Sequence, residues 1–176
     1  MYIVKTDRFG TDFFFSHYLL SAFQRDTKMS QLSKLHNIAT RQETTKFIYY
    51  SPLPPFEKAV KANCSSIMTS FNDNDGIPAT GNKKLLKGIL RKEWKFDGVV
   101  VSDWGSVTEM IKHGFAEDRK DAARKAIEAG LDMDMSSKAF IQNIEELIAK
   151  GIITEETLDN AVRNVLRLKF RLGPVS

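Results

Sequence analysis

The sequence predicts an α/β fold with parallel strands, and three observations lead to that prediction. A short β-branched run at 99–101 has the composition of a fully buried strand. Stretches with apolar residues at helical spacing lie on both sides of this run. A second short run, at 131–135, alternates apolar and acidic residues as strands do. Strands alternating with helices form right-handed βαβ units and a parallel sheet.

Residues 1–50 and residues 51–176 differ in pattern, and we treat them as two segments. The first segment shows no clean alternation of strand and helix, so its structure stays uncertain. From residue 51 onward the order is regular. Pro54 and Pro55 can open a helix, a strand is predicted over 65–71, and a loop rich in Asn, Asp and Gly covers 72–82.

The second half continues with helices around the two runs described above. The next helix is predicted from an apolar stripe formed by Leu85, Leu86, Ile89, Leu90 and Trp94. A helical stretch over 106–129 is interrupted near His113 and ends at Gly130. Two more helices follow, one stopped by Gly151 and one that starts at Thr154 and ends at 173–174.

Bulk composition excludes several classes of protein. The 176 residues are 42% hydrophobic and 27% charged, which is typical of one globular domain. A net charge of +4 is too small to indicate a nucleic-acid partner. The single Cys64 excludes an internal disulfide, and the three histidines lack the spacing of metal ligands.

No membrane segment or leader is expected. No apolar run approaches the roughly 20 residues that span a bilayer. Lys5, Asp7 and Arg8 stand where the apolar core of a signal peptide would begin. As written, the chain would stay in the compartment where it is made, the cytoplasm, and the localisation of a longer form stays open.

Asp103 is the strongest candidate for a functional residue. It directly follows the 99–101 run, and the carboxyl ends of parallel strands are where side chains reach a ligand. Ser106 and Glu109 have the spacing of a capping box, which predicts that Ser106 caps the next helix. The alternative, that Asp103 is itself a turn or cap residue, is thereby weakened. A carboxylate beside the indole of Trp104 suits glycoside chemistry.

Several separated motifs together resemble glycoside hydrolase family 3, with its bacterial β-glucosidase branch most similar. They are MTSFN at 68–72, GIPAT at 76–80, LRKEW at 90–94, FDGVVVSDWG at 96–105, AGLDMDM at 129–135 and the closing run 161–173. The resemblance spans about residues 51–173. It implies a partial (β/α)8 barrel of the TIM type, containing about the last three strands and their helices. A complete barrel typically needs about 250 residues.

The resemblance also implies a reaction: retaining, exo-acting hydrolysis of terminal β-D-glucosyl residues, without metal or organic cofactor. Asp103 matches the family's nucleophile, and Trp104 matches an aromatic residue at the substrate pocket. Met68 and Phe71 match the strand that lines this pocket, although many relatives have tyrosine at the position of Phe71. Barrel packing is an equally good explanation for both. The expected substrates are β-linked oligosaccharides and aryl or alkyl glucosides.

Two family features are missing from this sequence. Residues 1–50 contain no Lys-His-Phe sugar-binding motif. The second domain that commonly donates the general acid/base is also missing, so a complementary domain or subunit would have to supply that group. The sequence thus predicts a truncated β-glucosidase with little activity of its own. The alternative is a catalytically inactive remnant.

Three further patterns have competing explanations. The segment 76–83 lies between strand and helix like a phosphate-binding loop, but Asn82 stands where the lysine belongs. Asp132 and Asp134 share one face of the predicted strand, yet no third metal ligand is evident. Arg163, Arg167 and Arg171 form a stripe that we interpret as a solvated helix face rather than a nucleic-acid site.

Overall fold

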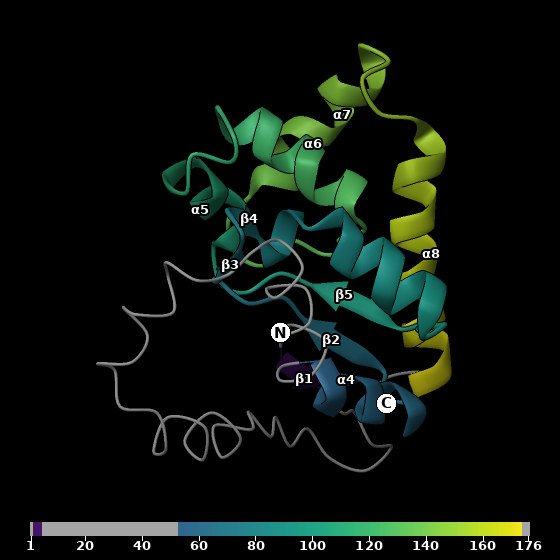
Figure 1. Ribbon diagram of the computed structural model, residues 1–176. Helices are drawn as coiled ribbons and strands as arrows, with labels where there is room; N and C mark the ends of the chain where they lie inside the picture. The colour runs from purple at the N-terminus through teal and green to yellow at the C-terminus, as the bar shows by residue number, and fades with distance from the viewer. Residues whose placement is uncertain (1, 5–52, 174–176) are drawn as a thin grey trace, which may run out of the picture.

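The computed structural model describes residues 2–4 and 53–173, and the following account concerns these residues (Figure 1). The strands are β1 (Tyr2–Val4), β2 (Ser66–Met68), β3 (Asp73–Asn74), β4 (Ile77–Pro78) and β5 (Val99–Val101). The helices are α4 (Leu53–Lys61), η1 (Ala79–Gly81), η2 (Lys84–Glu93), α5 (Ser106–Lys112), α6 (Arg119–Ala129), α7 (Ala139–Ala149) and α8 (Glu155–Leu172).

The main sheet has the strand order β1-β2-β5. Strands β2 and β5 are parallel, with Ser66 opposite Val99 and Met68 opposite Val101. The segment 131–135 continues the sheet on the other side of β5, through a parallel bridge between Val101 and Met133. This confirms the predicted parallel arrangement of strands joined through helices.

Strand β1 differs from the other sheet members because it pairs with β2 in the antiparallel direction. It belongs to the segment 1–50, for which the sequence predicted no element. The rest of that segment, 5–50, lies outside the described residues.

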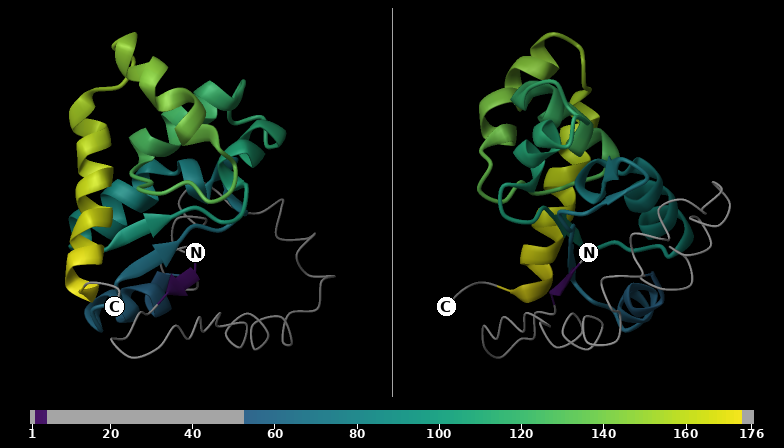
Figure 2. Two further views of the ribbon diagram at one scale, coloured as in Figure 1. Left: turned by 180° about the vertical axis from the view of Figure 1, so that it is seen from behind. Right: turned by 60° about the vertical axis from the view of Figure 1, so that its left-hand side comes forward.

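The core lies between the sheet and the helices that follow β2. Its fully buried side chains include Ile67 of β2, Val100 of β5, Leu86 and Leu90 of η2, and Leu131. Helix α6 packs against α5, α7, α8, η1 and η2, so it is the centre of the helical layer. Figure 2 shows this layer from two further sides, with α8 running past the ends of the other helices.

Most predicted helices are confirmed, and so is the strand 99–101, whereas the other two strands are shorter than predicted. The predicted strand 65–71 narrows to β2, so Phe71 lies beyond its end. The loop 72–82 contains the β3–β4 hairpin and the single turn η1. The predicted strand 131–135 makes only one bridge, at Met133. Helices α4, α7 and α8 lie where the sequence places them, and Gly130 ends α6 with φ 107°.

Helix η2 has an unusual winding. Its amide groups bond to carbonyls five residues back, as between Trp94 N and Ile89 O at 3.0 Å. This π-type winding is rare beyond a single turn. The predicted apolar stripe still faces inward, because Leu85, Leu86, Ile89 and Leu90 are all buried.

The described residues carry no membrane-spanning helix and no cluster of metal-ligating side chains. None of their helices is long and apolar enough to cross a membrane. Within the same ranges, no group of three His, Cys, Asp or Glu side chains could hold a metal ion.

Candidate active site

The candidate active site is the loop 102–105, at the carboxyl end of β5. Strands β2 and β5 run in the same direction, and both end near the β3–β4 hairpin and α5 (Figure 1). Residues that follow the two strands therefore share one edge of the sheet. This edge brings Thr69, Asp103 and the segment 131–135 into one neighbourhood.

Three hydrogen bonds fasten this loop to the neighbouring segment 131–135. Ser102 N donates to Met133 O at 2.9 Å, and Gly105 N donates to Met135 O at 2.9 Å. Between them, Met135 N donates to Ser102 Oγ at 2.7 Å. The Ser102 hydroxyl in turn donates to Asp103 O at 2.9 Å. Ser102 is fully buried, so its hydroxyl fixes the backbone on which Asp103 stands.

The Asp103 carboxylate is half-buried and accepts one hydrogen bond, from Trp104 N to Oδ1 at 2.7 Å. Among the described residues no arginine or lysine forms an ion pair with it. The carboxylate is thus oriented by its own loop, and its second oxygen, Oδ2, accepts no hydrogen bond from the described residues.

The predicted capping box is wrong. The N-cap of α5 is Gly105, which has a left-handed backbone (φ 69°) and offers no side chain. Ser106 lies one residue further on, inside the helix, and is buried. Its hydroxyl is 2.9 Å from Thr80 Oγ1, which is 2.9 Å from Thr69 Oγ1. Ser106 therefore ties α5 to η1 and to the end of β2 instead of capping the helix.

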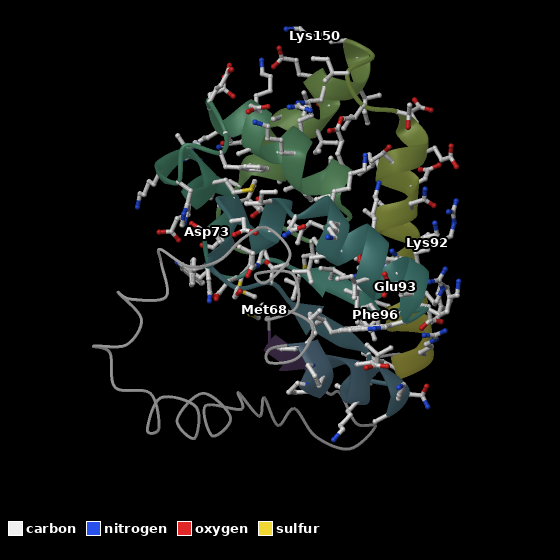
Figure 3. All side chains as sticks on the ribbon, in the orientation of Figure 1. Met68, Asp73, Lys92, Glu93, Phe96 and Lys150 are labelled. Carbon is white, nitrogen blue, oxygen red and sulfur yellow. The ribbon has the colours of Figure 1, made fainter. Side chains whose placement is uncertain are left out.

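The predicted substrate-contacting residues differ in exposure. Met68 is buried at the end of β2 (Figure 3), although it does not belong to the main core cluster. Trp104 is 70% exposed, Met133 43% and Phe71 38%. Phe71 lies just past the end of β2, Trp104 lies just past the end of β5, and Met133 lies in the segment beside β5. Met133 was not predicted from the sequence, because an alternating run does not reveal which of its faces is covered.

Asp103 and the predicted contact residues line neither of two cavities found in the described part. A cavity of about 400 Å³ is lined by Lys87, Arg91, Leu131 and Asn164 among others. Another, of about 440 Å³, is lined by Cys64, Ser65, Phe96 and Arg171 among others. Both adjoin residues that precede the strands, at the opposite end from Asp103. In Figure 3, Met68 and Asp73 lie on one side of the view, and Phe96, Lys92 and Glu93 lie on the other.

Asp132 forms a structural cluster at that opposite end. Its Oδ2 accepts from Arg91 at 2.6 Å and from Val100 N at 2.8 Å, and its Oδ1 accepts from Asn164 at 2.9 Å. Burial raises the pKa of Asp132, opposed by the charge of Arg91, and burial lowers the pKa of Arg91. These contacts join η2, β5 and α8, so Asp132 holds three elements together.

The other competing patterns also have structural roles. Asp134 accepts from Ser137 Oγ and from Phe140 N at the start of α7. In the segment 76–83, Thr80 is buried, and its hydroxyl lies between those of Thr69 and Ser106. Asn82 Oδ1 accepts from Leu85 N. That segment forms a hairpin end and a helical turn instead of an open phosphate cradle.

The arginine stripe is largely solvated, as predicted, because Arg163 and Arg171 are exposed and Arg167 is half-buried. Two of the three arginines also make contacts at this surface. Arg171 pairs with the Asp97 carboxylate at 2.6 Å, and Arg167 donates to Asp97 O at 3.0 Å. The hydrogen bond from Arg171 lowers the pKa of Asp97. Two of the three arginines therefore attach α8 to the residues that precede β5.

Comparison with known proteins identifies consistent relatives. The sequence model of the glycosyl hydrolase family 3 N-terminal domain matches residues 26–168. A periplasmic β-glucosidase of Salmonella typhimurium is 41% identical over 121 residues, covering 69% of this chain and 16% of that protein. A putative β-xylosidase of Formosa agariphila is 40% identical over 122 residues, covering 68% of this chain and 16% of that protein.

Solved structures give the same result. A β-glucosidase from Listeria innocua, in complex with glucose, superposes with a TM-score of 0.72 at 45% identity. The match covers 73% of this chain and 18% of that one. The chain therefore spans about a sixth of the length of the relatives it matches. The family match also begins at residue 26, some distance before the start at 51 that the sequence motifs indicated.

Proposed function

Since the chain belongs to glycoside hydrolase family 3, we propose that it carries the nucleophile-bearing part of a retaining exo-β-glucosidase. The three parallel segments, β2, β5 and 131–135, would be the last three strands of a (β/α)8 barrel. In this proposal residues 51–176 are the C-terminal part of the barrel domain, and residues 1–50 form a separate segment. TIM-type barrels carry their catalytic groups at the carboxyl ends of the strands, which is where Asp103 lies.

The observation that carries the proposal is the state of the Asp103 carboxylate. It is half-buried, is oriented by Trp104 N at 2.7 Å and makes no ion pair among the described residues. Such a carboxylate can attack the anomeric carbon of a bound β-glucoside. The bond to the departing oxygen breaks as an α-linked glucosyl ester forms on Asp103, and an acid protonates that oxygen. Water then cleaves the ester and restores the β configuration.

Retaining enzymes need a second carboxyl group, about 5–5.5 Å from the nucleophile, as the acid/base. None of the described residues has been matched to that role, and we propose that it is filled from outside them. We assign the missing group to a complementary domain or subunit. The substrates proposed are β-linked glucosides, since the Listeria innocua relative was solved with glucose and its mutant with laminaribiose.

The exposed side chains of Trp104, Phe71 and Met133 would lie beside the bound glycoside. The flat indole suits the apolar face of a sugar ring, and Phe71 adds apolar surface without a hydroxyl. Met68 is buried, and we assign it to packing beneath these groups. No step in this mechanism requires a metal ion or an organic cofactor.

A chimera tests the proposal directly. Residues 51–173 of this chain replace the matching segment of the Salmonella typhimurium relative, which then supplies the rest of the site. We expect hydrolysis of an aryl β-glucoside, and we expect Asp103→Ala to reduce kcat by more than about 10³-fold. Azide should restore turnover of that variant and yield α-glucosyl azide, because it attacks where the carboxylate is missing. Glu145→Ala, which removes an exposed carboxylate on α7, is the control.

Two results would contradict the assignment. If the Asp103→Ala chimera keeps its activity, Asp103 is not the nucleophile. If its activity is lost but azide yields no α-glucosyl azide, Asp103 acts only by holding the loop.

A further inference from the structure

Helix α8 exposes an apolar face that the described part of the chain leaves uncovered. Only Ala161 of its 18 residues is buried. Val162 is 44% exposed, Leu166 46% and Phe170 84%. These three residues are spaced four apart, so they form one ridge on the helix, of the kind that interdigitates in common helix–helix contacts.

The ridge points away from the rest of the described residues. Helix α8 contacts chiefly α6 and β5, and it runs along one edge of the molecule in Figure 1 and in the left view of Figure 2. Scattered exposed apolar residues are ordinary on protein surfaces, but a continuous row of them indicates an interaction site.

The charges along α8 favour one particular partner. The first half of α8 carries Glu155, Glu156 and Asp159, with Arg163 at its end. The second half carries Arg167, Lys169 and Arg171, of which Arg171 is already paired with Asp97. A second copy of the same helix in antiparallel orientation places each acidic half beside a basic half. The two helix dipoles then also oppose each other favourably. We propose that the Val162–Leu166–Phe170 ridge joins two copies of this chain through antiparallel packing of α8.

A two-fold axis near position 164 satisfies both the apolar and the charge pattern. Val162 then meets Leu166 of the second copy, and Asp159 meets Lys169 of the second copy. Symmetry repeats each contact, as expected for an interface that uses the same patch on both subunits.

The size of the surface sets the strength of the dimer. An 18-residue helix is about 27 Å long. One face of such a helix is less than the roughly 800 Å² per partner of a standard stable interface. The dimer is therefore weak, and its population rises with protein concentration.

Sedimentation equilibrium of the full chain, from low micromolar to several hundred micromolar, tests the proposal. We expect a reversible monomer–dimer equilibrium that Leu166→Lys weakens at least about tenfold. Ile141→Lys on α7 is the control, because Ile141 is 86% exposed on another helix and should leave the equilibrium unchanged. Circular dichroism checks that both variants keep their helix content.

A charge exchange makes the test specific for orientation. Asp159→Lys and Lys169→Asp should each weaken self-association, because each places like charges opposite one another. Mixing the two variants should restore dimers, since every pair in the mixed dimer is complementary. Restored mixed dimers support antiparallel packing.

Three outcomes would overturn the proposal. The chain could remain monomeric at every concentration, or its dimer could be insensitive to Leu166→Lys. The third outcome is a monomer that sediments with phosphatidylserine-containing vesicles and loses this binding in the Leu166→Lys variant, which would assign the ridge to a membrane surface.

Discussion

The buried Asp132 carboxylate joins three separate elements through single hydrogen bonds. Its side chain is 4% exposed, and it pairs with Arg91, whose side chain is 20% exposed. Arg91 also donates to the carbonyls of Phe96 and Gly98, which hold the residues before β5. Removing the carboxylate would leave a largely buried guanidinium without its counter-charge.

We therefore predict that Asp132→Ala lowers the free energy of unfolding by about 3–5 kcal/mol, the usual cost of breaking a buried ion pair. Urea denaturation followed by circular dichroism measures it. Glu145→Ala is the matched control, because Glu145 is exposed on α7 and should change stability by less than about 0.5 kcal/mol. Equal effects of the two substitutions would show that the cluster is not a structural centre.

At the site, Asp103 could be selected from the sequence, and Ser102 could not. A carboxylate at the end of an apolar run beside a tryptophan stands out in any sequence. The role of Ser102 depends on Met135 N, which lies 33 residues away and reaches its hydroxyl only through the parallel pairing. The same limit explains the wrong capping box, since Ser106 finds a tertiary partner in Thr80.

Among the elements, helices were predictable because their signals are local. Thr154 caps α8 by accepting from Thr157 N, and Gly130 ends α6 in a left-handed conformation. Strand lengths were less predictable. The alternation at 131–135 suggests a full strand, but only Met133 forms a bridge, because Asp132 and Asp134 direct their side chains to Arg91 and to the start of α7.

Replacing two glycines by alanine should change the stability of the fold in opposite directions. Gly98 lies in the turn before β5, and Gly88 lies within η2. A Cβ at Gly98 would lie 2.3 Å from Ser65 O, the carbonyl that accepts from Val99 N at the start of β5. A Cβ at Gly88, within η2, would meet nothing closer than Lys84 Cγ at 3.9 Å.

We expect Gly98→Ala to destabilise the fold by about 1–3 kcal/mol or more, because backbone must move. Gly88→Ala should stabilise it by up to about 1 kcal/mol, because alanine favours helix. Thermal unfolding of both variants measures the difference. A stable Gly98→Ala variant would mean that β2 and β5 are not packed as closely as described.

For the whole molecule, a single continuous core argues that the described residues unfold together. The core cluster extends from Leu53 of α4 to Ile153, just before α8. We predict one cooperative thermal transition for the chain alone, but no turnover of an aryl β-glucoside above the buffer rate. The missing acid/base alone would cost about 10²–10⁴-fold. A featureless melt would instead support the inactive remnant, and enzyme-like turnover would show that the chain supplies its own acid.

The α/β class and the parallel pairing of β2 with β5 followed from sequence order alone. The position of β1 did not, because three residues at the chain's start carry no signal that selects a partner 60 positions away. The exposed ridge of α8 was also unforeseen, since periodicity reveals an apolar face without revealing whether anything covers it.

The antiparallel pairing of β1 with β2 has a consequence for barrel assembly. The backbone groups on one edge of β2 are already occupied by Tyr2–Val4. A parallel strand that pairs with β2 from that side would first have to displace these three residues. Completion of the barrel would then be an exchange of strands. Its rate would be set by the dissociation of β1 from β2, and deletion of Tyr2–Val4 would accelerate it.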